Sequence, residues 1–453
     1  MEGLTAILFS ICILAVLLLI GKIMRVKIGL FQRIFLPSSI IGGFIGLAVG
    51  PFGLDLIPEF ILGTWGEIPG VLINIVFATL FLGVAIPGIR KVWSMGGSQL
   101  CFGAVIGTGQ YFVALLVTAL VLTPFFGVNH EFGTILEIGF SGGHGTAAGM
   151  ASVFEAVGFP EGTALAYMSA TVGIIVAVVG GIVFINIAIR RDQCVNFDKN
   201  ESIPEYKKKG LIKEQSDRYS TSEATVASES IEPLAFHFSV VAVAILIGWI
   251  MLIFVRKIHP QLEGFPLFPL AMMGGMIIQI ISKPLKLTNY YDKNTFDRIL
   301  GISLDFLVVA AISTLRLDLF LENVWPFLIL MAVGIAWIMF CLVFLAPKMF
   351  PNNWFERGIT EYGMQTGVTA IGLLLLRLVD PHYKTDTAQA FGFKQMIYEP
   401  FLGGGFITAT IPFIVFSKGI WWSIIVAGSL ALFFFVLSWL NGWVNFSRRA
   451  WRS

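Results

Sequence analysis

Apolar residues along this chain are grouped in long runs, and polar or glycine-rich breaks separate one run from the next. A helix needs about 20 consecutive apolar residues to cross the hydrocarbon core of a bilayer. Eleven runs come near this length, and each ends at a charge cluster or a Gly/Pro turn. They cover residues 5–21, 34–50, 68–88, 99–125, 161–189, 235–255, 265–282, 299–315, 325–347, 396–416 and 420–443. The pattern predicts an all-α polytopic membrane protein.

Two further apolar stretches, residues 132–157 and 358–380, are interrupted by small and polar residues at their centres. The first contains Ser141-Gly-Gly-His-Gly-Thr-Ala-Ala-Gly149, and the second contains Gly363-Met-Gln-Thr-Gly-Val-Thr-Ala370. Glycine frees the backbone to leave the helix. Broken backbone at membrane depth is tolerated only where it is buried in protein or lines a wet cavity. We expect two re-entrant hairpins; two ordinary spans with kinks are the alternative.

The composition supports a membrane protein and excludes several other classes. Hydrophobic residues make up 56% of the chain and charged residues 13%, whereas soluble domains carry about 25% charged residues. This excludes a soluble enzyme, a disordered chain and a nucleic-acid binder. The four cysteines show no pairing or metal-binding spacing.

Lysine and arginine predict the orientation, because they concentrate on the cytoplasmic side of a membrane. With the N-terminus outside, the inner side holds 26 of the 30 basic residues, in segments 22–33, 90–91, 190–234, 283–298, 348–357, 377–394 and 448–452. The outer side keeps Arg256, Lys257, Arg316 and Lys418. We therefore expect an outside N-terminus and a cytoplasmic C-terminus.

The two halves of the chain match weakly. Pro37-Ser-Ser-Ile-Ile-Gly-Gly43 corresponds to Pro269-Leu-Ala-Met-Met-Gly-Gly275, and Phe81-Leu-Gly-Val-Ala resembles Phe306-Leu-Val-Val-Ala. Each half has five spans and a hairpin before the fifth. An odd number of spans makes the second copy insert upside down. Inverted repeats with discontinuous elements are the architecture of secondary transporters.

The predicted fold is thus two inverted five-helix repeats, each with a re-entrant hairpin, plus one extra C-terminal helix. The repeats cover residues 1–190 and 235–417. Residues 191–234, hydrophilic and rich in Lys, Ser and Glu, form a cytoplasmic linker that we expect to be mobile. Residues 418–453 hold the extra helix and a cytoplasmic tail.

The two hairpin tips carry the candidate binding residues. Freed carbonyls and hydroxyls suit Na⁺, and exposed N–H groups suit carboxylates. The substrate candidates are Ser141, Gly142, Gly143, His144, Gly145, Thr146, Gln365, Thr366, Gly367 and Thr369. The candidate Na⁺ ligands are Ser141, Thr146, Thr366 and Asp305. A close-packed helix crossing with a hydrogen-bonded His144 is the alternative for the first tip.

Asp305 is a carboxylate in the eighth span, and such a charge in the membrane is expensive unless it is paired, protonated or cation-bound. It helps to bind a cation, or it lies near the inner surface and faces Arg298. Both interpretations stay open.

The chain resembles the bacterial sodium/glutamate symporter family. The resemblance rests on Leu36-Pro-Ser-Ser-Ile-Ile-Gly-Gly43, Phe77-Ala-Thr79, the 141–149 motif, Ala170-Thr-Val-Gly173 and residues 363–371, and it covers about residues 5–417. It implies Na⁺-driven symport of glutamate or a similar small carboxylate or amino acid. It also implies a homodimer in the bacterial inner membrane, whose substrate-carrying core moves against a scaffold as in elevator-type transporters.

The chain departs from this family at the second tip, where Gln365-Thr-Gly-Val-Thr369 replaces a Gly-Ala-Thr-Pro-Thr core. Asp305 and the helix at 420–443 are further departures. An H⁺- or Na⁺-coupled transporter of a different organic anion is therefore the first alternative. An intramembrane enzyme with His144 as base is a remote one, since the chain has no HExxH or GxSxG motif. A channel would more typically show charge rings. We expect Na⁺ as the coupling ion, no organic cofactor and no nucleic-acid partner.

Overall fold

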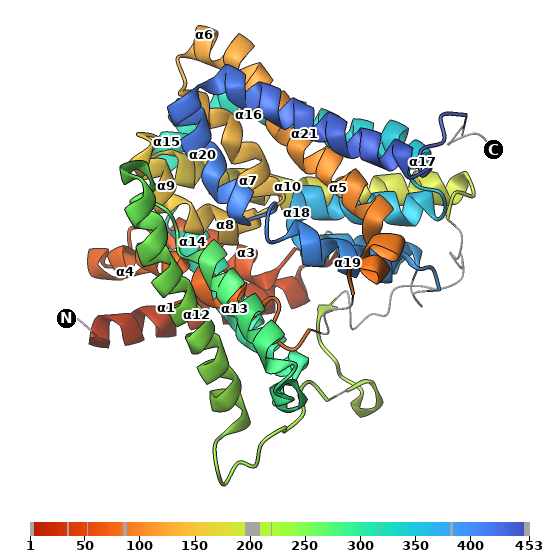
Figure 1. The fold of residues 1–453 in the computed structure, drawn as a ribbon. Coiled ribbons are helices and arrows are strands. Elements are labelled where there is room, and N and C mark those ends of the chain that lie inside the picture. Colours follow the sequence, from red (N-terminus) through yellow and green to blue (C-terminus); the bar gives the residue numbers. More distant parts are fainter. Residues whose placement is uncertain are drawn as a thin grey trace. The chain divides into compact units, whose positions relative to one another are not determined.

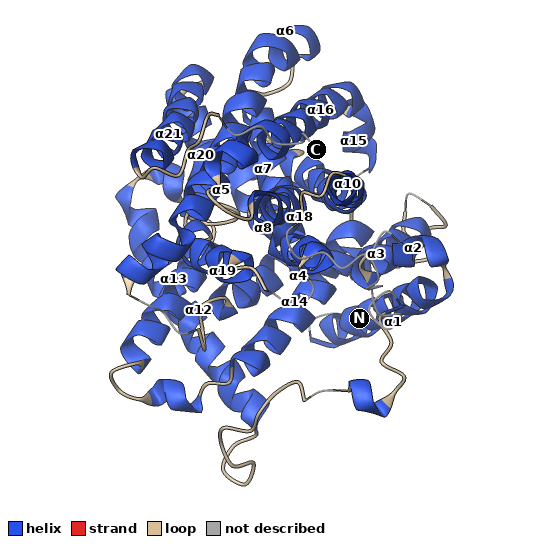
Figure 2. Ribbon diagram, turned by 90° about the vertical axis from the view of Figure 1, so that its right-hand side faces the viewer, coloured by secondary structure: helices blue, strands red, loops and turns tan. Residues whose placement is uncertain are grey.

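The computed structural model describes residues 4–33, 36–51, 53–84, 88–194, 209–218, 220–315, 317–380 and 384–447. Every regular element in these residues is a helix, as Figure 2 shows. The prediction of an all-α class is confirmed for this part of the chain. Some of the basic residues that predict the orientation lie outside the described residues, in segments 195–208 and 448–453 and at Arg316.

Eight helices in the described residues are long and apolar enough to cross a membrane. They are Thr5–Lys27, Glu59–Thr79, Arg90–Phe126, Gly162–Arg190, Pro233–Ile258, Val324–Met349, Trp354–Val379 and Ile420–Leu440. Six coincide with predicted runs, and Trp354–Val379 covers the predicted second hairpin. The predicted run 68–88 is wrong in its bounds, because the helix there, Glu59–Thr79, begins and ends nine residues earlier. Three predicted runs correspond to shorter apolar helices, Ser38–Val49, Phe268–Ser282 and Phe406–Lys418. The remaining run, 299–315, corresponds to the helix Lys293–Ser313, which is not among the eight. The chain is a multi-pass membrane protein.

The helices fall into two compact units, each drawn from both halves of the chain (Figure 1). Unit 1 comprises Met1–Ile86, Ala148–Ala156 and Ile203–Leu317. Its helices are α1 (Leu4–Lys27), α2 (Gly29–Arg33), α3 (Ser38–Val49), α4 (Glu59–Thr79), α9 (Ala151–Ala156), α12 (Pro233–Ile258), α13 (Phe268–Ser282) and α14 (Lys293–Ser313), with short 3-10 turns η3 (Gln215–Asp217), η4 (Pro260–Leu262) and η5 (Leu287–Tyr290).

Unit 2 comprises Pro87–Ala147, Val157–Ser202 and Asp318–Ser453. Its elements are α5 (Ile89–Val117), η1 (Thr118–Leu122), α6 (Thr123–Phe126), η2 (His130–Thr134), α7 (Ile135–Phe140), α8 (Gly143–Gly149), α10 (Gly162–Arg190), α15 (Leu317–Glu322), α16 (Val324–Phe340), η6 (Cys341–Leu345), α17 (Ala346–Met349), α18 (Trp354–Val379), α19 (Thr387–Tyr398), α20 (Phe406–Lys418) and α21 (Ile420–Leu440). The last two residues of α8 belong to unit 1, and α15 begins at its edge.

The paired glycines of the two repeated motifs make equivalent contacts inside unit 1. The first glycine faces a backbone carbonyl of the first helix of its own half: Gly42 faces Leu17 of α1, and Gly274 faces Ala244 of α12. The second glycine faces a helix of the other half of the chain, α14 or α4. Gly43 packs on Ile312 of α14, and Gly275 packs on the Ala78 carbonyl of α4. Small residues let helix backbones approach closely, which is a principal means of helix association in membranes.

Within unit 1, equivalent helices of the two halves of the chain also have equivalent packing partners. Helix α1 packs on α3 as α12 packs on α13, and α3 packs on α14 as α13 packs on α4. This is the pattern expected when one unit is duplicated. Contacts do not define the direction in which each half crosses a membrane, so the inverted orientation stays a prediction. The compact units are also a different division of the chain from the predicted repeats 1–190 and 235–417.

The second part of the predicted linker makes hydrogen bonds to residues around the start of α14. Thr225 donates a hydrogen bond from Oγ1 to the Tyr290 carbonyl at 2.7 Å, and the Glu223 N–H donates to Asp292 Oδ2 at 3.1 Å. Arg298 Nε donates to the Thr221 carbonyl at 2.9 Å. These bonds connect residues 221–225 to η5 and to the start of α14, and the mobility of the linker stays a prediction.

The glycine pairing can be tested by stability. We expect Gly274→Ala to lower the free energy of unfolding by about 1–3 kcal/mol, because the added methyl group overlaps the Ala244 carbonyl. Gly63→Ala is the matched control, since a Cβ at this position in α4 meets no atom within 4 Å. The control should be neutral or stabilising by up to about 1 kcal/mol. Equal losses in the two variants, measured by unfolding in detergent micelles, would contradict the packing.

Candidate functional site

Helix α18 is broken at the centre of the predicted second hairpin. Gly367 has φ −145° and ψ 33°, and Val368 has φ 66° and ψ 168°, so both leave the helical region. A Cβ on Gly363 would lie 2.9 Å from the Gly372 Cα. In a straight helix these two residues would be about 13 Å apart. The chain therefore reverses direction at Gly367–Val368, and its two legs pack on each other.

Three glycines of α10 bring that helix close to the reversed chain. Gly180 faces the Tyr362 hydroxyl on the first leg, and Gly181 faces Leu375 on the second leg. The Tyr362 hydroxyl donates to the Val176 carbonyl at 2.9 Å, and Gly173 lies against the Thr366 carbonyl. Larger residues at these positions of α10 would push both legs away.

The first predicted tip is also a helix break. Helix α7 ends at Phe140, and α8 starts at Gly143, whose φ of +71° is in the left-handed region that favours glycine. A Cβ on Gly143 would overlap Cγ1 of Val368. The two tips therefore touch within unit 2, and each has a left-handed residue at the contact.

The ten predicted substrate residues lie in the two segments that break here, and the hydroxyl or ring groups of three of them bond to nearby residues of unit 2. His144 Nε2 is 3.0 Å from Thr171 Oγ1, and Thr146 Oγ1 donates to the Gly142 carbonyl at 2.9 Å. The Thr366 hydroxyl donates to the Tyr362 carbonyl. The ten residues are Ser141, Gly142, Gly143, His144, Gly145, Thr146, Gln365, Thr366, Gly367 and Thr369. Their role in binding stays a prediction.

Asp305 belongs to unit 1, whereas the tip residues belong to unit 2. Its carboxylate accepts a hydrogen bond from Ser39 and lies near the Lys22 ammonium. Neither of these neighbours is Arg298, the partner that one of the two interpretations expected. Its role as a Na⁺ ligand stays a prediction.

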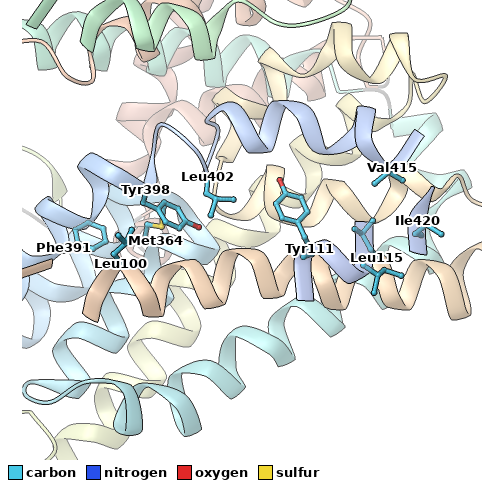
Figure 3. Close-up of a cluster of buried hydrophobic side chains, with 11 residues drawn as sticks. Leu100, Tyr111, Leu115, Met364, Phe391, Tyr398, Leu402, Val415 and Ile420 are labelled. Atoms are coloured by element: carbon cyan, nitrogen blue, oxygen red, sulfur yellow. The ribbon is translucent and has the colours of Figure 1, made fainter. Parts of the chain in front are cut away.

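A buried ion pair lies beside the second tip, and the sequence did not point to it. Lys394 Nζ on α19 is 3.1 Å from Glu361 Oε2 on α18, and both side chains are 0% exposed. Gln99 Nε2 on α5 donates to the other Glu361 oxygen at 2.9 Å. The charge count placed Lys394 in the inner segment 377–394, a surface connection. Instead, Lys394 is buried. Apolar residues of α19 on either side of Lys394 belong to the hydrophobic cluster of Figure 3, which includes Met364, Phe391 and Tyr398.

The ion pair continues into a network of amides and hydroxyls. Gln395 Oε1 accepts from Lys394 Nζ at 2.7 Å, and Gln395 Nε2 donates to Thr369 Oγ1 at 2.5 Å and to Glu399 Oε1 at 2.7 Å. The predicted tip residue Thr369 also donates to Glu399 Oε1 at 2.9 Å. The second leg of the hairpin is thus hydrogen-bonded to the helix that carries Lys394.

Gln365 links the tip to helix α5. Its Nε2 donates to the Gly103 carbonyl at 3.0 Å and to the Tyr398 hydroxyl at 2.9 Å. Gln110 Nε2 donates to the Gln365 carbonyl at 3.0 Å. Within the described residues, the Oε1 atoms of Gln99 and Gln110 are buried without a hydrogen-bond partner. Such acceptors favour a bound donor or cation.

A second buried carboxylate, Glu137, lies one turn before the first tip. It accepts hydrogen bonds from the Tyr111 hydroxyl, from the Gly403 N–H at 3.0 Å and from Thr408 Oγ1 at 3.3 Å. Gly403 belongs to a glycine-rich loop, residues 399–405, which separates α19 from α20. The predicted span 396–416 is therefore wrong at its start: α20 begins at Phe406.

Only part of this network could be found from sequence. Glu137 and Lys394 are ionisable residues next to apolar runs, and such residues are functional candidates when they lie inside the membrane. No sequence motif contains either residue, and the partners Tyr111 of Glu137 and Glu361 of Lys394 are 26 and 33 residues away in sequence. The described residues contain no group of three or more His, Cys, Asp or Glu side chains that could hold a metal ion.

Comparison with protein-family models gives a match to the model described as Sodium/glutamate symporter, over residues 4–369. No curated protein matches the chain. The matched range is about four fifths of the 453 residues. It includes both tips and Glu137, and it ends before α19, which carries Lys394.

The contact between the tips can be tested by a double-mutant cycle. We expect Gly143→Ala to lower the free energy of unfolding by about 2–4 kcal/mol, through left-handed strain of about 1–2 kcal/mol and overlap with Val368. In a Val368→Gly background only the strain should remain.

Gly158→Ala is the matched control, because Gly158 has a similar φ of +73° and a Cβ there meets no atom within 4 Å. Its cost should be about 1–2 kcal/mol in both backgrounds. If Gly143→Ala is equally costly with and without Val368, the tips do not touch.

Proposed function

The chain belongs to the sodium/glutamate symporter family, and from this premise we propose that it uses the Na⁺ gradient to import glutamate or a similar small carboxylate. The protein is a membrane transporter and not an enzyme. The observation that carries the proposal is the contact of the two tips at Gly143 and Val368, inside a unit that buries ionisable and amide side chains. Tips that meet inside such a unit can form one binding site.

The polar groups near the tips suit an anion and a cation bound together. In the proposal, a bound carboxylate takes over donors that now bond within the protein: the Gln365 amide, the Thr369 hydroxyl and the Lys394 ammonium. Acceptors for a cation include the unpartnered Oε1 atoms of Gln99 and Gln110. A carboxylate and Na⁺ that bind side by side offset each other's charge in a low-dielectric site. This mutual dependence is the physical basis of coupling in the proposal.

In the proposal, the two hairpins are re-entrant, and unit 2 carries the substrate while unit 1 is the scaffold. The division of the chain supports an elevator-type movement, because both tips and the buried carboxylates Glu137 and Glu361 belong to unit 2. The Lys/Arg distribution supports an outside N-terminus and a cytoplasmic C-terminus in a bacterial inner membrane. A homodimer follows from the family resemblance.

Coupling to H⁺, with a different organic anion as substrate, is the second candidate. Glu137 favours it, because this carboxylate is 0% exposed and accepts hydrogen bonds from three donors, none of which is a cation. Proton relays in membrane proteins use buried Glu and Asp side chains. His144 as an enzymatic base has no such support, since its ring bonds Thr171 and stacks on Tyr167.

Uptake of radiolabelled L-glutamate into proteoliposomes tests the proposal. We expect accumulation with an inward Na⁺ gradient and none with K⁺ alone. Thr146→Val should weaken the apparent affinities for Na⁺ and substrate by about tenfold each, because it removes one oxygen from the first tip.

Thr410→Val is the matched control. Thr410 Oγ1 also donates to the carbonyl four residues earlier, at 3.0 Å, on helix α20. This variant should stay within about twofold of the parent protein in both affinities. Na⁺-independent uptake, or H⁺-driven uptake of another carboxylate, would support the second candidate instead.

A further inference from the structure

The Lys394 ammonium lies in a set of acceptors that would suit a free monovalent cation. Its Nζ is 3.1 Å from Glu361 Oε2, 2.7 Å from Gln395 Oε1 and 3.5 Å from the Met364 sulfur. The Tyr398 ring centroid is 3.7 Å away, within the range of a cation–π interaction. One carboxylate, one amide, one thioether and one aromatic face thus surround a single positive charge.

Other residues hold these acceptors in place. Gln99 fixes the second oxygen of Glu361 at 2.9 Å, and Thr369 and Glu399 bond the Nε2 atom of Gln395. Gly103 of α5 leaves room for the charge: a Cβ there would lie 2.6 Å from Lys394 Cε and 3.0 Å from Glu361 Oε2. The geometry therefore does not depend on the lysine alone.

A purely structural role explains this arrangement poorly. A buried ion pair is often no more stabilising than well-packed apolar residues of similar volume. Ionisable groups within membrane-spanning segments are rare and mark functional sites by default. The pair is also connected to the second tip on both legs, through Met364 on the first leg and through Gln395 and Thr369 on the second.

We propose that Lys394 is a tethered cation: its ammonium permanently occupies a monovalent-cation site beside the second tip. There it supplies to the substrate site one positive charge that a diffusible coupling ion would otherwise carry. This inference rests on the proposed symport, which it deepens by assigning one of the site's cations to the chain itself. Removal of the side chain should leave an empty site for a small external cation.

The first experiment measures cation binding without transport. Purified Lys394→Ala is heated with ammonium, methylammonium, Na⁺ or N-methylglucamine chloride. We expect ammonium or methylammonium to raise its unfolding temperature saturably, by about 3 °C at a hundredfold excess over the dissociation constant. N-methylglucamine is too large and should have no effect. The parent protein and Lys418→Ala, which removes an exposed lysine of unit 2, should not respond.

Adding Glu361→Gln to Lys394→Ala removes the carboxylate of the site and should abolish the response. A folded Lys394→Ala protein whose unfolding temperature ignores every small cation would overturn the inference. So would an equal response in the double variant. Because this measurement needs no transport, it can support the cation site even if the proposed Na⁺-driven uptake fails in the parent protein.

The second experiment measures the Na⁺ dependence of uptake in proteoliposomes. If Na⁺ enters the vacated site, the Hill coefficient for Na⁺ should rise by about one in Lys394→Ala. Lys394→Met keeps the packing of the aliphatic part of the side chain, and it replaces Lys394→Ala if the alanine variant does not fold. The Hill coefficient of Lys394→Met should rise in the same way. Lys394→Arg keeps the charge and should match the parent. An unchanged Hill coefficient in both neutral variants contradicts a tethered cation.

Discussion

Polar groups that the bilayer core cannot hydrate must find their partners inside the protein, and the structure of unit 2 follows from this constraint. The backbone leaves the helix at Gly143, at Val368 and at Gly403. Each break is enclosed by protein: Gly143 and Val368 contact each other, and the Gly403 N–H bonds Glu137. The breaks and the buried charges therefore stabilise each other and gather in one unit.

Close packing of helices makes this enclosure possible. Glycines of α10 and α5 leave space for the Tyr362 hydroxyl, the Lys394–Glu361 pair and the Tyr398 hydroxyl. In unit 1 the paired glycines of the repeated motif bring helix backbones together in the same way. The glycines of this chain thus have two structural effects. They let helix backbones approach each other closely, and they leave space for buried polar side chains between the helices.

Much of the fold could be predicted from the sequence, because apolar periodicity and glycine motifs act locally. The helical class, most spans and both helix breaks follow from such signals, and the GG motifs at 42–43 and 274–275 showed which helices are equivalent. The partners of Glu137 and Lys394 could not be predicted, since they come from distant helices. The glycine-rich loop at 399–405 was hidden inside an apolar run. The three hydrogen bonds of residues 221–225 could not be predicted either, because their partners lie more than 60 residues away in sequence.

Joint binding of substrate and Na⁺ is the central claim, and calorimetric titration of L-glutamate into the purified protein tests it most directly. The titration is repeated at several Na⁺ concentrations, with K⁺ added to keep the ionic strength constant. Because linkage is reciprocal, we expect the dissociation constant to fall about tenfold for each tenfold rise in Na⁺ per coupled ion, until Na⁺ saturates its site. A dissociation constant that is the same at every Na⁺ concentration would contradict coupled binding.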